Sequence, residues 1–341
     1  MDTWYLENLA CPRDYLALDY RDGGLHCGNG HVYRVVDGVP VMLLDDVHQT
    51  LRVADESIKK AVSGINDESD GVYLETLGIS EAEKHDVIRL ASDPMRKIDP
   101  VVSYLVGATN GIAYKRLSGN LEEYPIPEIR MPRGRGETLL DIGCNWGRWC
   151  VSAAKKGYRA VGIDPSLGAV MAARRVARQF GLEIKYIVGD ARFLPFKASG
   201  FEHVFSYSVL QHFSREDATQ SVKEIGRVVK PGGNALIQMP NVLGARCLYH
   251  QARRGFREAI EFEVRYWSIP SLRKLFSSYV GPTDITVDCF FGIGLQYSDL
   301  RLMPMTHKAV ILTSELLRKV SDFARPITYL ADSVYVSSVK P

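Results

Sequence analysis

The sequence predicts an α/β fold built on an open, mainly parallel sheet, because strand-like apolar runs alternate with helix-like runs through the second half of the chain. The clearest unit covers residues 139–147, where an apolar strand passes through Asp141 into a Gly-x-x-x-Gly turn. The next run, 149–156, has helical spacing and is closed by Gly157. Ligands bind at the carboxyl ends of strands in such sheets, so this turn is a candidate binding loop.

The two glycines of the turn, Gly143 and Gly147, permit φ angles that other side chains resist and leave bare backbone for a ligand to approach. A dinucleotide-binding motif would be Gly-x-Gly-x-x-Gly, whereas this frame has Asn145 and Arg148 at the second and third positions. Arg148 puts a bulky side chain where a helix and a strand pack closely. A nicotinamide dinucleotide is therefore the weaker alternative for this loop.

A second apolar strand, within residues 161–165, ends in Asp164, twenty-three residues after Asp141. An acid at about this distance in a βαβ unit accepts hydrogen bonds from both hydroxyls of a ribose. The alternative is that Asp164 caps a helix that begins at Pro165, since Asp is a favoured N-cap and Pro a favoured first helical residue. The two roles are compatible.

Two further strand ends follow in order. Residues 184–188 lead into Asp190 and Ala191, and an apolar strand from Val204 continues into a Ser-Val-Leu-Gln-His sequence. A helix, a Gly-Gly turn and another strand come next. The order and spacing of these four motifs over residues 137–341 resemble those of class I S-adenosylmethionine-dependent methyltransferases.

The resemblance implies a Rossmann-like, seven-stranded methyltransferase sheet that binds S-adenosylmethionine. It assigns the methionine end of the cofactor to the first loop, with Asp141, Gly143, Cys144 and Gly147. It assigns the ribose to Asp164 with Pro165 beside it, the adenine to Asp190 and Ala191, and the neighbourhood of the methyl group to Ser208. Members of this class commonly have a third glycine where this chain has Asn145, which predicts a stiffer or differently shaped loop.

His212, just beyond the fourth strand, is the candidate catalytic base, because methylation of a hydroxyl or an amine requires that its proton be removed. The alternative is a solvent-facing loop histidine. In that interpretation it merely precedes a helix capped by Ser214, with Asp217 completing a Ser-x-x-Asp box.

Residues 1–44 form a separate module, in which short strands at 16–20 and 25–32 flank a Gly-Gly turn. The pattern is similar to the zinc-ribbon module that accompanies several RNA and translation-factor methyltransferases. Its two knuckles supply the candidate zinc ligands Cys11, Asp14, Cys27 and His31. Zinc accepts thiolate, imidazole and carboxylate. The alternative is a degenerate ribbon that has lost its metal and keeps only its small core, and His26 is the poorer ligand because a strand would turn it to the other face.

Residues 45–136 are predicted to form a helical lid and a proline-rich strap, and residues 137–341 the catalytic domain. Helices are expected within 47–62 and 81–91, whereas the prolines of 124–132 exclude a helix there. Aromatic and basic groups gather in an insertion after residue 241, namely Tyr249, His250, Arg253, Arg254, Arg257, Arg265, Tyr266 and Trp267. This insertion either holds a sugar, a phosphate or an RNA base, or is a solvated helix with paired charges. A helix at 307–323 and a final strand at 333–339 close the predicted fold.

Net charge, apolar runs and cysteine spacing narrow the classes of protein to which this chain can belong. A net charge of +2 gives no electrostatic footprint for nucleic acid, and no run approaches the roughly 20 apolar residues of a membrane span. The amino terminus does not resemble a signal peptide and the six cysteines lack a Cys-x-x-Cys pair, so a cytoplasmic protein with reduced thiols is expected.

The leading functional prediction is O-methylation of a small molecule or a sugar-containing intermediate, with a glycan- or lipid-type acceptor. An RNA methyltransferase acting on tRNA or rRNA is the first alternative. The second is a non-catalytic module that binds a cofactor or a partner, which the acids Asp141, Asp164 and Asp190 disfavour.

Overall fold

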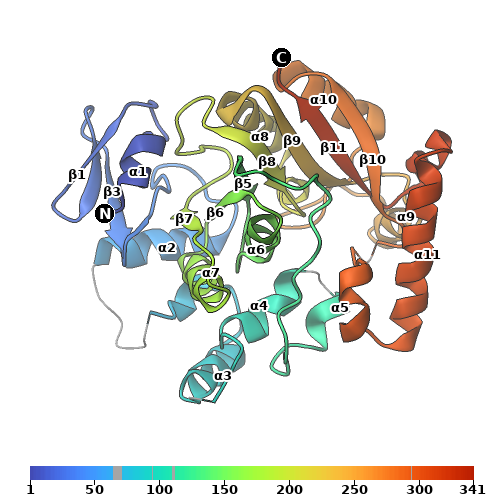
Figure 1. Ribbon diagram of the computed structural model, residues 1–341, viewed down its shortest axis with the longest axis horizontal. Coiled ribbons are helices and arrows are strands. Elements are labelled where there is room, and N and C mark those ends of the chain that lie inside the picture. Colours follow the sequence, from blue (N-terminus) through green and yellow to red (C-terminus); the bar gives the residue numbers. More distant parts are fainter. Residues whose placement is uncertain (64–70, 94, 110–111, 293) are drawn as a thin grey trace.

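The computed structural model describes residues 1–63, 71–93, 95–109, 112–292 and 294–341 (Figure 1). Within these residues the main body is a seven-stranded sheet of order β10-β11-β9-β8-β5-β6-β7. Its parallel strands are β5 (Thr138–Ile142), β6 (Arg159–Asp164), β7 (Lys185–Val188), β8 (Phe201–Ser206) and β9 (Val229–Pro240). The last strand, β11 (Ser333–Val339), runs antiparallel to both β9 and β10 (Thr283–Cys289). The predicted Rossmann-like sheet with its closing antiparallel pair is confirmed.

Helices cover both faces of this sheet because its strand residues alternate between two apolar cores. On β5, Leu140 packs into the core shared with α8 (Arg215–Val228) and α10 (Ile269–Tyr279). Its neighbour Leu139 packs into the opposite core, with α6 (Arg148–Lys155) and α7 (Leu167–Gln179). The parallel strands are thus buried on both sides, as their continuous apolar runs predict.

Two of the helix starts differ in how well their caps were predicted. Ser214 Oγ accepts a hydrogen bond from the backbone N–H of Asp217 at 3.0 Å, which confirms the predicted cap of α8. The alternative in which Asp164 caps α7 is wrong. Helix α7 begins at Leu167, and Ser166 is its N-cap, accepting from the N–H of Ala169 at 3.2 Å. Asp164 is thereby left for other contacts.

The amino-terminal module contains α1 (Thr3–Asn8) and a four-stranded sheet of β1 (Leu18–Arg21), β2 (Gly24–Cys27), β3 (Val32–Val36) and β4 (Val39–Pro40). The predicted strand 25–32 is therefore two strands. The chain turns after Cys27, where the N–H of Gly30 donates to the Cys27 carbonyl at 3.0 Å and Gly30 has a φ of +86°. The module joins the large sheet at its β7 edge, because the N–H of Met42 donates to the carbonyl of Val188 at 2.7 Å (Figure 1).

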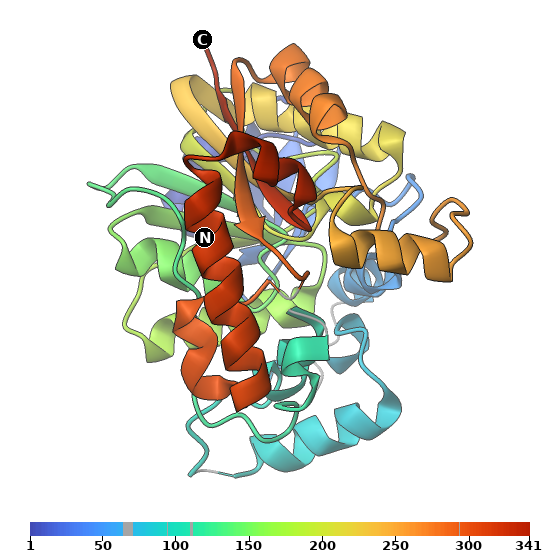
Figure 2. The same cartoon turned by 90° about the vertical axis from the view of Figure 1, so that its right-hand side faces the viewer.

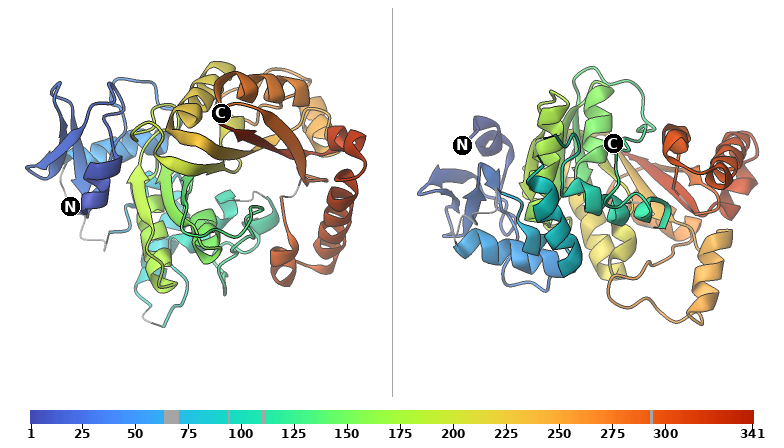
Figure 3. Two further views of the ribbon diagram at one scale, coloured as in Figure 1. Left: turned by 45° about the horizontal axis from the view of Figure 1, so that its top comes forward. Right: turned by 90° about the horizontal axis from the view of Figure 1, so that it is seen from below.

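The segment between the module and the sheet is helical, as predicted. It contains α2 (Arg52–Ser63), a 3-10 turn (Leu74–Thr76), α3 (Glu81–Ala91), α4 (Val102–Thr109) and α5 (Ile112–Lys115). In Figure 1, α3, α4 and α5 lie beneath the sheet, and Figure 3 shows the same segment from below. The strap at 124–132 contains neither helix nor strand, which confirms the interpretation of its prolines.

Two insertions flank the carboxyl-terminal half of the sheet. The first contains α9 (Ala245–Arg253), and the second contains a 3-10 helix (Tyr297–Leu302), α11 (Met305–Ser321) and another 3-10 helix (Arg325–Leu330). Both α9 and α11 face the viewer in Figure 2. In the described part of the chain, no helix combines the length and the apolar character needed to cross a bilayer.

Candidate functional site

A cavity of about 790 Å³ lies at the carboxyl ends of β5, β6, β7, β8 and β9. Seven of the predicted site residues border it, namely Gly143, Asp164, Pro165, Asp190, Ala191, Ser208 and His212. Three others from the first loop, Asp141, Cys144 and Gly147, lie behind its wall. The structure therefore gathers residues from four separate strand ends around one space.

The first loop depends on backbone conformations that few residues adopt. Gly143 has a φ of +74°, and a Cβ added there would lie 2.2 Å from Cγ2 of Val209. Asn145, which replaces the expected third glycine, has a φ of +48°. Asn is among the side chains that tolerate this left-handed region. Its side-chain oxygen accepts from the N–H of Trp146 at 2.8 Å, which fixes Asn145 in this conformation.

Asp164 connects this loop to the second strand end. Its Oδ2 accepts from the N–H of Asn145 at 2.9 Å, and its Oδ1 accepts from the N–H of Ser166 at 3.0 Å. Burial raises the pKa of Asp164 to about 6, against the effect of these two hydrogen bonds. Each oxygen keeps a second lone pair, so the carboxylate can still accept hydrogen bonds from a ligand in the cavity.

The third strand end holds Asp190 in an ion pair. Arg192 Nη2 lies 2.6 Å from Asp190 Oδ2, and the same guanidinium donates to the carbonyl of His48 at 2.9 Å. Asp190 is thereby fixed between the sheet and the segment that precedes α2. Ala191 beside it is buried and completes this part of the cavity wall.

Asp141, Cys144 and Gly147, which lie behind the cavity wall, are buried in the protein interior. Asp141 is 1% exposed, its Oδ2 accepts from the thiol of Cys150 at 3.2 Å, and burial raises its pKa to about 7. Burial also raises the pKa of the Cys144 thiol, to about 11. Gly147 has a φ of +79°, and a Cβ there would approach the Tyr186 hydroxyl to 2.6 Å. These contacts hold the loop in shape from behind.

His212 follows β8 in a short 3-10 turn and is half-buried in the cavity wall. Its ring stacks on Phe262 with centroids 3.8 Å apart. Its Nδ1 lies 2.7 Å from the Phe262 carbonyl, and its Nε2 lies 3.2 Å from the amide nitrogen of Gln211. A carbonyl accepts and an amide nitrogen donates, so these contacts put the proton on Nδ1 and a lone pair on Nε2. Burial lowers the pKa of His212 to about 4, which keeps the ring neutral near pH 7.

The other end of the cavity is formed by residues that sequence reasoning missed. Tyr207 and Gln238 border it from β8 and β9, and Arg246, Asp288 and His307 border it from α9, β10 and α11. The only signal in the sequence was the basic and aromatic insertion. Two of that group, His250 and Tyr266, do line the cavity, and Arg265 supports the His212 carbonyl from Nη1 at 2.8 Å.

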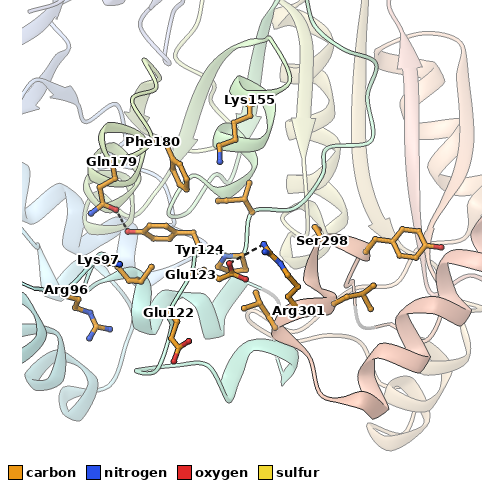
Figure 4. A pocket seen from close by; sticks show the side chains of 16 residues that line it. Arg96, Lys97, Glu122, Glu123, Tyr124, Lys155, Gln179, Phe180, Ser298 and Arg301 are labelled. Atoms are coloured by element: carbon orange, nitrogen blue, oxygen red, sulfur yellow. Dashed lines mark hydrogen bonds and ion pairs between the residues drawn. The ribbon is translucent and has the colours of Figure 1, made fainter.

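A second, wider hollow of about 1020 Å³ lies between the strap, α7 and the second insertion (Figure 4). Charged residues of both signs surround it, and Tyr124 donates from its hydroxyl to Gln179 at 2.6 Å. Its described lining contains no predicted site residue and no carboxyl end of a strand. The 790 Å³ cavity is therefore the better candidate for a functional site.

The four candidate zinc ligands of the amino-terminal module also come together. Their ligand atoms all lie within 4.8 Å of one another. Cys11 Sγ is 3.3 Å from His31 Nδ1, and Cys27 Sγ is 3.2 Å from Asp14 Oδ2. Bonds of 2.0–2.3 Å around tetrahedral zinc would place ligand atoms roughly 3.3–3.8 Å apart. The Cys11–His31 and Cys27–Asp14 pairs are close to this spacing, and thiolate, imidazole and carboxylate are all ligands that zinc accepts.

Residues 139–233 match a family described as a methyltransferase domain. This match covers the first glycine loop, Asp164, Asp190 and His212. Residues 139–233 thus match a methyltransferase domain and form part of a Rossmann-like sheet.

The chain matches only part of each curated relative. Norajmaline N-methyltransferase of Rauvolfia serpentina is 35% identical over 109 residues, which are 31% of this chain and 37% of that protein. Ubiquinone biosynthesis O-methyltransferase of Methylocella silvestris is 31% identical over 175 residues, which are 47% of this chain and 64% of that protein. The chain thus spans less than two thirds of either relative.

Among solved structures, the complex of the Haloferax volcanii Trm112 methyltransferase activator with a methyltransferase has a TM-score of 0.43 at 20% identity, covering 62% of this chain and 85% of that one. Haemonchus contortus phosphoethanolamine N-methyltransferase 2, solved with S-adenosyl-L-methionine, has a TM-score of 0.41 at 20% identity. It covers 62% of this chain and 50% of that one.

Proposed function

We propose that this protein is an S-adenosylmethionine-dependent methyltransferase whose cofactor and acceptor meet in the 790 Å³ cavity. The methyltransferase-domain match supports the class of reaction. The observation that carries the proposal is the meeting of Gly143, Asp164 and His212 around one space at the strand ends. A solely structural role would not require a bare glycine backbone, a buried carboxylate and a neutral imidazole to share a cavity.

The residues present fit the cofactor. Gly143 offers backbone with no side chain, Asp164 keeps lone pairs for ribose hydroxyls, and Asp190 with Ala191 forms the wall where an adenine is expected. When bound, the cofactor supplies a methyl group that is already activated by the positive charge of its sulfonium. The protein then has mainly to align the acceptor with that methyl group.

The acceptor that this cavity favours is a hydroxyl of a small molecule. Methyl transfer to a hydroxyl oxygen releases its proton, and His212 presents a neutral Nε2 lone pair in the cavity wall to receive it. Gln211 occupies that lone pair at 3.2 Å in this structure, so its amide must turn aside when the acceptor binds. Tyr207, Gln238 and Tyr266 add hydroxyl and amide groups suited to a sugar-containing or other polar acceptor.

Labelled cofactor tests the proposal directly. The pure protein should bind S-adenosylmethionine in a calorimetric titration, and incubation with fractionated metabolites, lipids and RNA should label a metabolite or lipid fraction. Label in the RNA fraction alone would favour the RNA methyltransferase instead. Failure to bind the cofactor at all would overturn the methyltransferase proposal.

We further propose that Cys11, Asp14, Cys27 and His31 hold one zinc ion that stabilises the amino-terminal module. The spacing of the four donors supports this, as does the small size of a module with few core residues of its own. Elemental analysis should find about one zinc per chain, and Cys27→Ser should release it. His26→Ala is the matched control, because His26 Nε2 contacts the Arg21 carbonyl and lies outside the cluster. A folded, metal-free protein would establish the degenerate ribbon.

A further inference from the structure

Arg246 is a cation in the wall of the 790 Å³ cavity that has no acid paired with it. It lies in the first turn of α9 and is half-buried. Its Nε donates to Nε2 of His250 at 3.4 Å. In the part of the chain that the structure describes, the guanidinium makes no ion pair, and its Nη1 and Nη2 make no hydrogen bond. The outer fork of Arg246 is therefore available to a ligand in the cavity.

The stem of Arg246 lies against the bare backbone of Gly292, which follows β10 and also borders the cavity. A Cβ added at Gly292 would lie 2.8 Å from Cδ of Arg246 and 3.2 Å from its Cβ. Gly292 has a φ of +59°, a conformation that side chains other than glycine resist. The glycine thus leaves the space that the arginine stem occupies at the cavity wall.

Asp332 also borders the cavity, but its charge serves the start of α9. Its Oδ1 accepts from the backbone N–H of Arg246 at 2.7 Å and from that of Cys247 at 3.0 Å. These are the N–H groups that an N-cap side chain bonds, and the N-cap of α9 is Gly244, which has no side chain to offer. Asp332 therefore caps the helix from a distant part of the chain, and the helix start compensates its charge.

The second acid at this end of the cavity, Asp288, has partners of its own. Its Oδ2 accepts from the hydroxyls of Tyr207 at 3.0 Å and Ser333 at 2.9 Å. Arg130 Nη1 lies 4.0 Å from its Oδ1 and supplies the opposite charge. Neither acid is thus left to neutralise Arg246.

A second nitrogen without a partner borders the cavity from the start of α11. His307 lines the cavity, and its Nδ1 is buried with no hydrogen-bond partner among the described residues. Leaving such a group unbonded costs free energy that a ligand recovers by bonding it. A neutral imidazole donates from one of its ring nitrogens. An arginine fork and an imidazole N–H are both donors, and donors of this kind suit the oxygens of an anion.

Resting on the proposed function, we propose that the methyl acceptor carries a phosphate or carboxylate group, which Arg246 binds with His307 as a second donor. The planar guanidinium fork matches two oxygens of either group. The charged group then holds the acceptor at the end of the cavity away from the predicted cofactor residues, and leaves its hydroxyl for His212. The acceptor is accordingly an acidic small molecule and not a neutral sugar.

Titration with simple anions tests this site before the acceptor is known. Inorganic phosphate, and acetate in a parallel series, are titrated calorimetrically into the whole chain at constant ionic strength. Arg246→Gln should weaken phosphate binding roughly ten- to a hundredfold, the range for loss of a charge-assisted hydrogen bond. Arg246→Lys keeps the charge without the planar fork and should recover part of the loss. His307→Ala should weaken binding by about fivefold, the equivalent of a neutral hydrogen bond.

Arg253→Gln is the matched control. Arg253 lies on the same helix as Arg246, is exposed, and is outside the described lining of the cavity. Its substitution removes the same charge and should leave phosphate binding unchanged. Equal weakening in Arg246→Gln and Arg253→Gln, or a wild type that binds neither anion, would overturn the proposal.

The labelled product gives a second test. When label is transferred from S-adenosylmethionine to small metabolites separated from RNA, the product should be retained on an anion exchanger. Arg246→Gln should raise KM for the purified acceptor roughly tenfold or more and keep both kcat and the affinity for S-adenosylhomocysteine. A product that passes the exchanger unretained would overturn the proposal. A wild type that binds no cofactor would contradict the proposed function instead, while the anion titration still judges the Arg246 site by itself.

Discussion

The two halves of the cavity are built differently. The residues predicted to bind the methionine end, the ribose and the adenine of the cofactor all lie in one stretch of 51 residues between Asp141 and Ala191, and backbone conformation determines the shape of their first loop. The acceptor half is assembled from segments that are far apart in the chain, including Gln238, Arg246 and His307. A binding loop shaped by its backbone can be recognised from a local sequence pattern. A pocket formed by side chains of distant elements has no such pattern.

Burial favours the neutral form of a titratable group in both halves of the cavity. It raises the pKa of Asp164 to about 6 in the cofactor half and lowers the pKa of His212 to about 4 at the boundary with the acceptor half. In each case desolvation favours the neutral form of the group. For a carboxylate this weakens a hydrogen-bond acceptor, but for an imidazole it preserves the base. The environment is thus better suited to proton removal at His212 than to charge at Asp164.

The largest effect is expected at the boundary between the halves. His212→Ala should lower turnover by roughly 10² to 10⁴, because loss of a general base acts on the transition state. Cofactor affinity should stay within about twofold, as measured by calorimetry. His250→Ala is the matched control, since His250 is a histidine that also lines the cavity, but it lies on α9 and not at the end of a strand of the sheet. Full turnover in His212→Ala on the true acceptor would remove the base from the mechanism.

The pH profile tests the same residue without mutation. Because the pKa of His212 is lowered to about 4, the ring should stay neutral, and kcat at saturating cofactor should hold from pH 7 down to about pH 5 before falling. The sign for stability follows as well. A histidine whose folded pKa lies below its unfolded value contributes stability above about pH 6.5, and loses it as the pH falls towards 4. An activity decline centred near pH 6.5 would contradict this environment.

The next effect concerns the loop of the cofactor half. Gly143→Ala should cost about 2–5 kcal/mol of stability, from left-handed backbone strain and from overpacking against Val209. It should also abolish measurable cofactor binding. Gly181→Ala is the control, because Gly181 has a φ of +65° but open space around it. Chemical denaturation should show the larger loss at Gly143, and equal losses would refute the close contact.

The sequence predicted the sheet, its helices and seven of the residues that border the cavity, because periodicity and glycine spacing report local backbone states. It offered Asp164 as an alternative cap of α7 because Asp164 and Ser166 are both residue types that cap helices, and only the backbone path decides between them. It joined β2 to β3 although Gly28, Asn29 and Gly30 are typical turn residues, and the turn lies there. It gave no hint that Arg148 is surrounded by rings from three elements, since such contacts exist only after folding.

Asp164→Ala should have a smaller effect than the loop mutation. Loss of a charge-assisted hydrogen bond of about 1.5–3 kcal/mol corresponds to roughly ten- to a hundredfold weaker cofactor binding. Because Asp164 also accepts from Asn145 and Ser166, part of the loss reflects a looser loop. Asp164→Asn, which keeps one oxygen, should fall between the mutant and the wild type. Calorimetric affinity unchanged in Asp164→Ala would remove this residue from the site.

The smallest effect is expected at Asp190, where the proposed contact is with the adenine. Asp190→Asn keeps an acceptor oxygen, so cofactor binding should weaken by only about fivefold, the equivalent of about 1 kcal/mol for a neutral hydrogen bond. The substitution also breaks the ion pair with Arg192, but that guanidinium keeps its bonds to the His48 carbonyl and to Asp217. The melting temperature without ligand should therefore change little. A large fall in melting temperature with unchanged affinity would show that Asp190 serves Arg192 alone, and that the adenine is held by other parts of the wall.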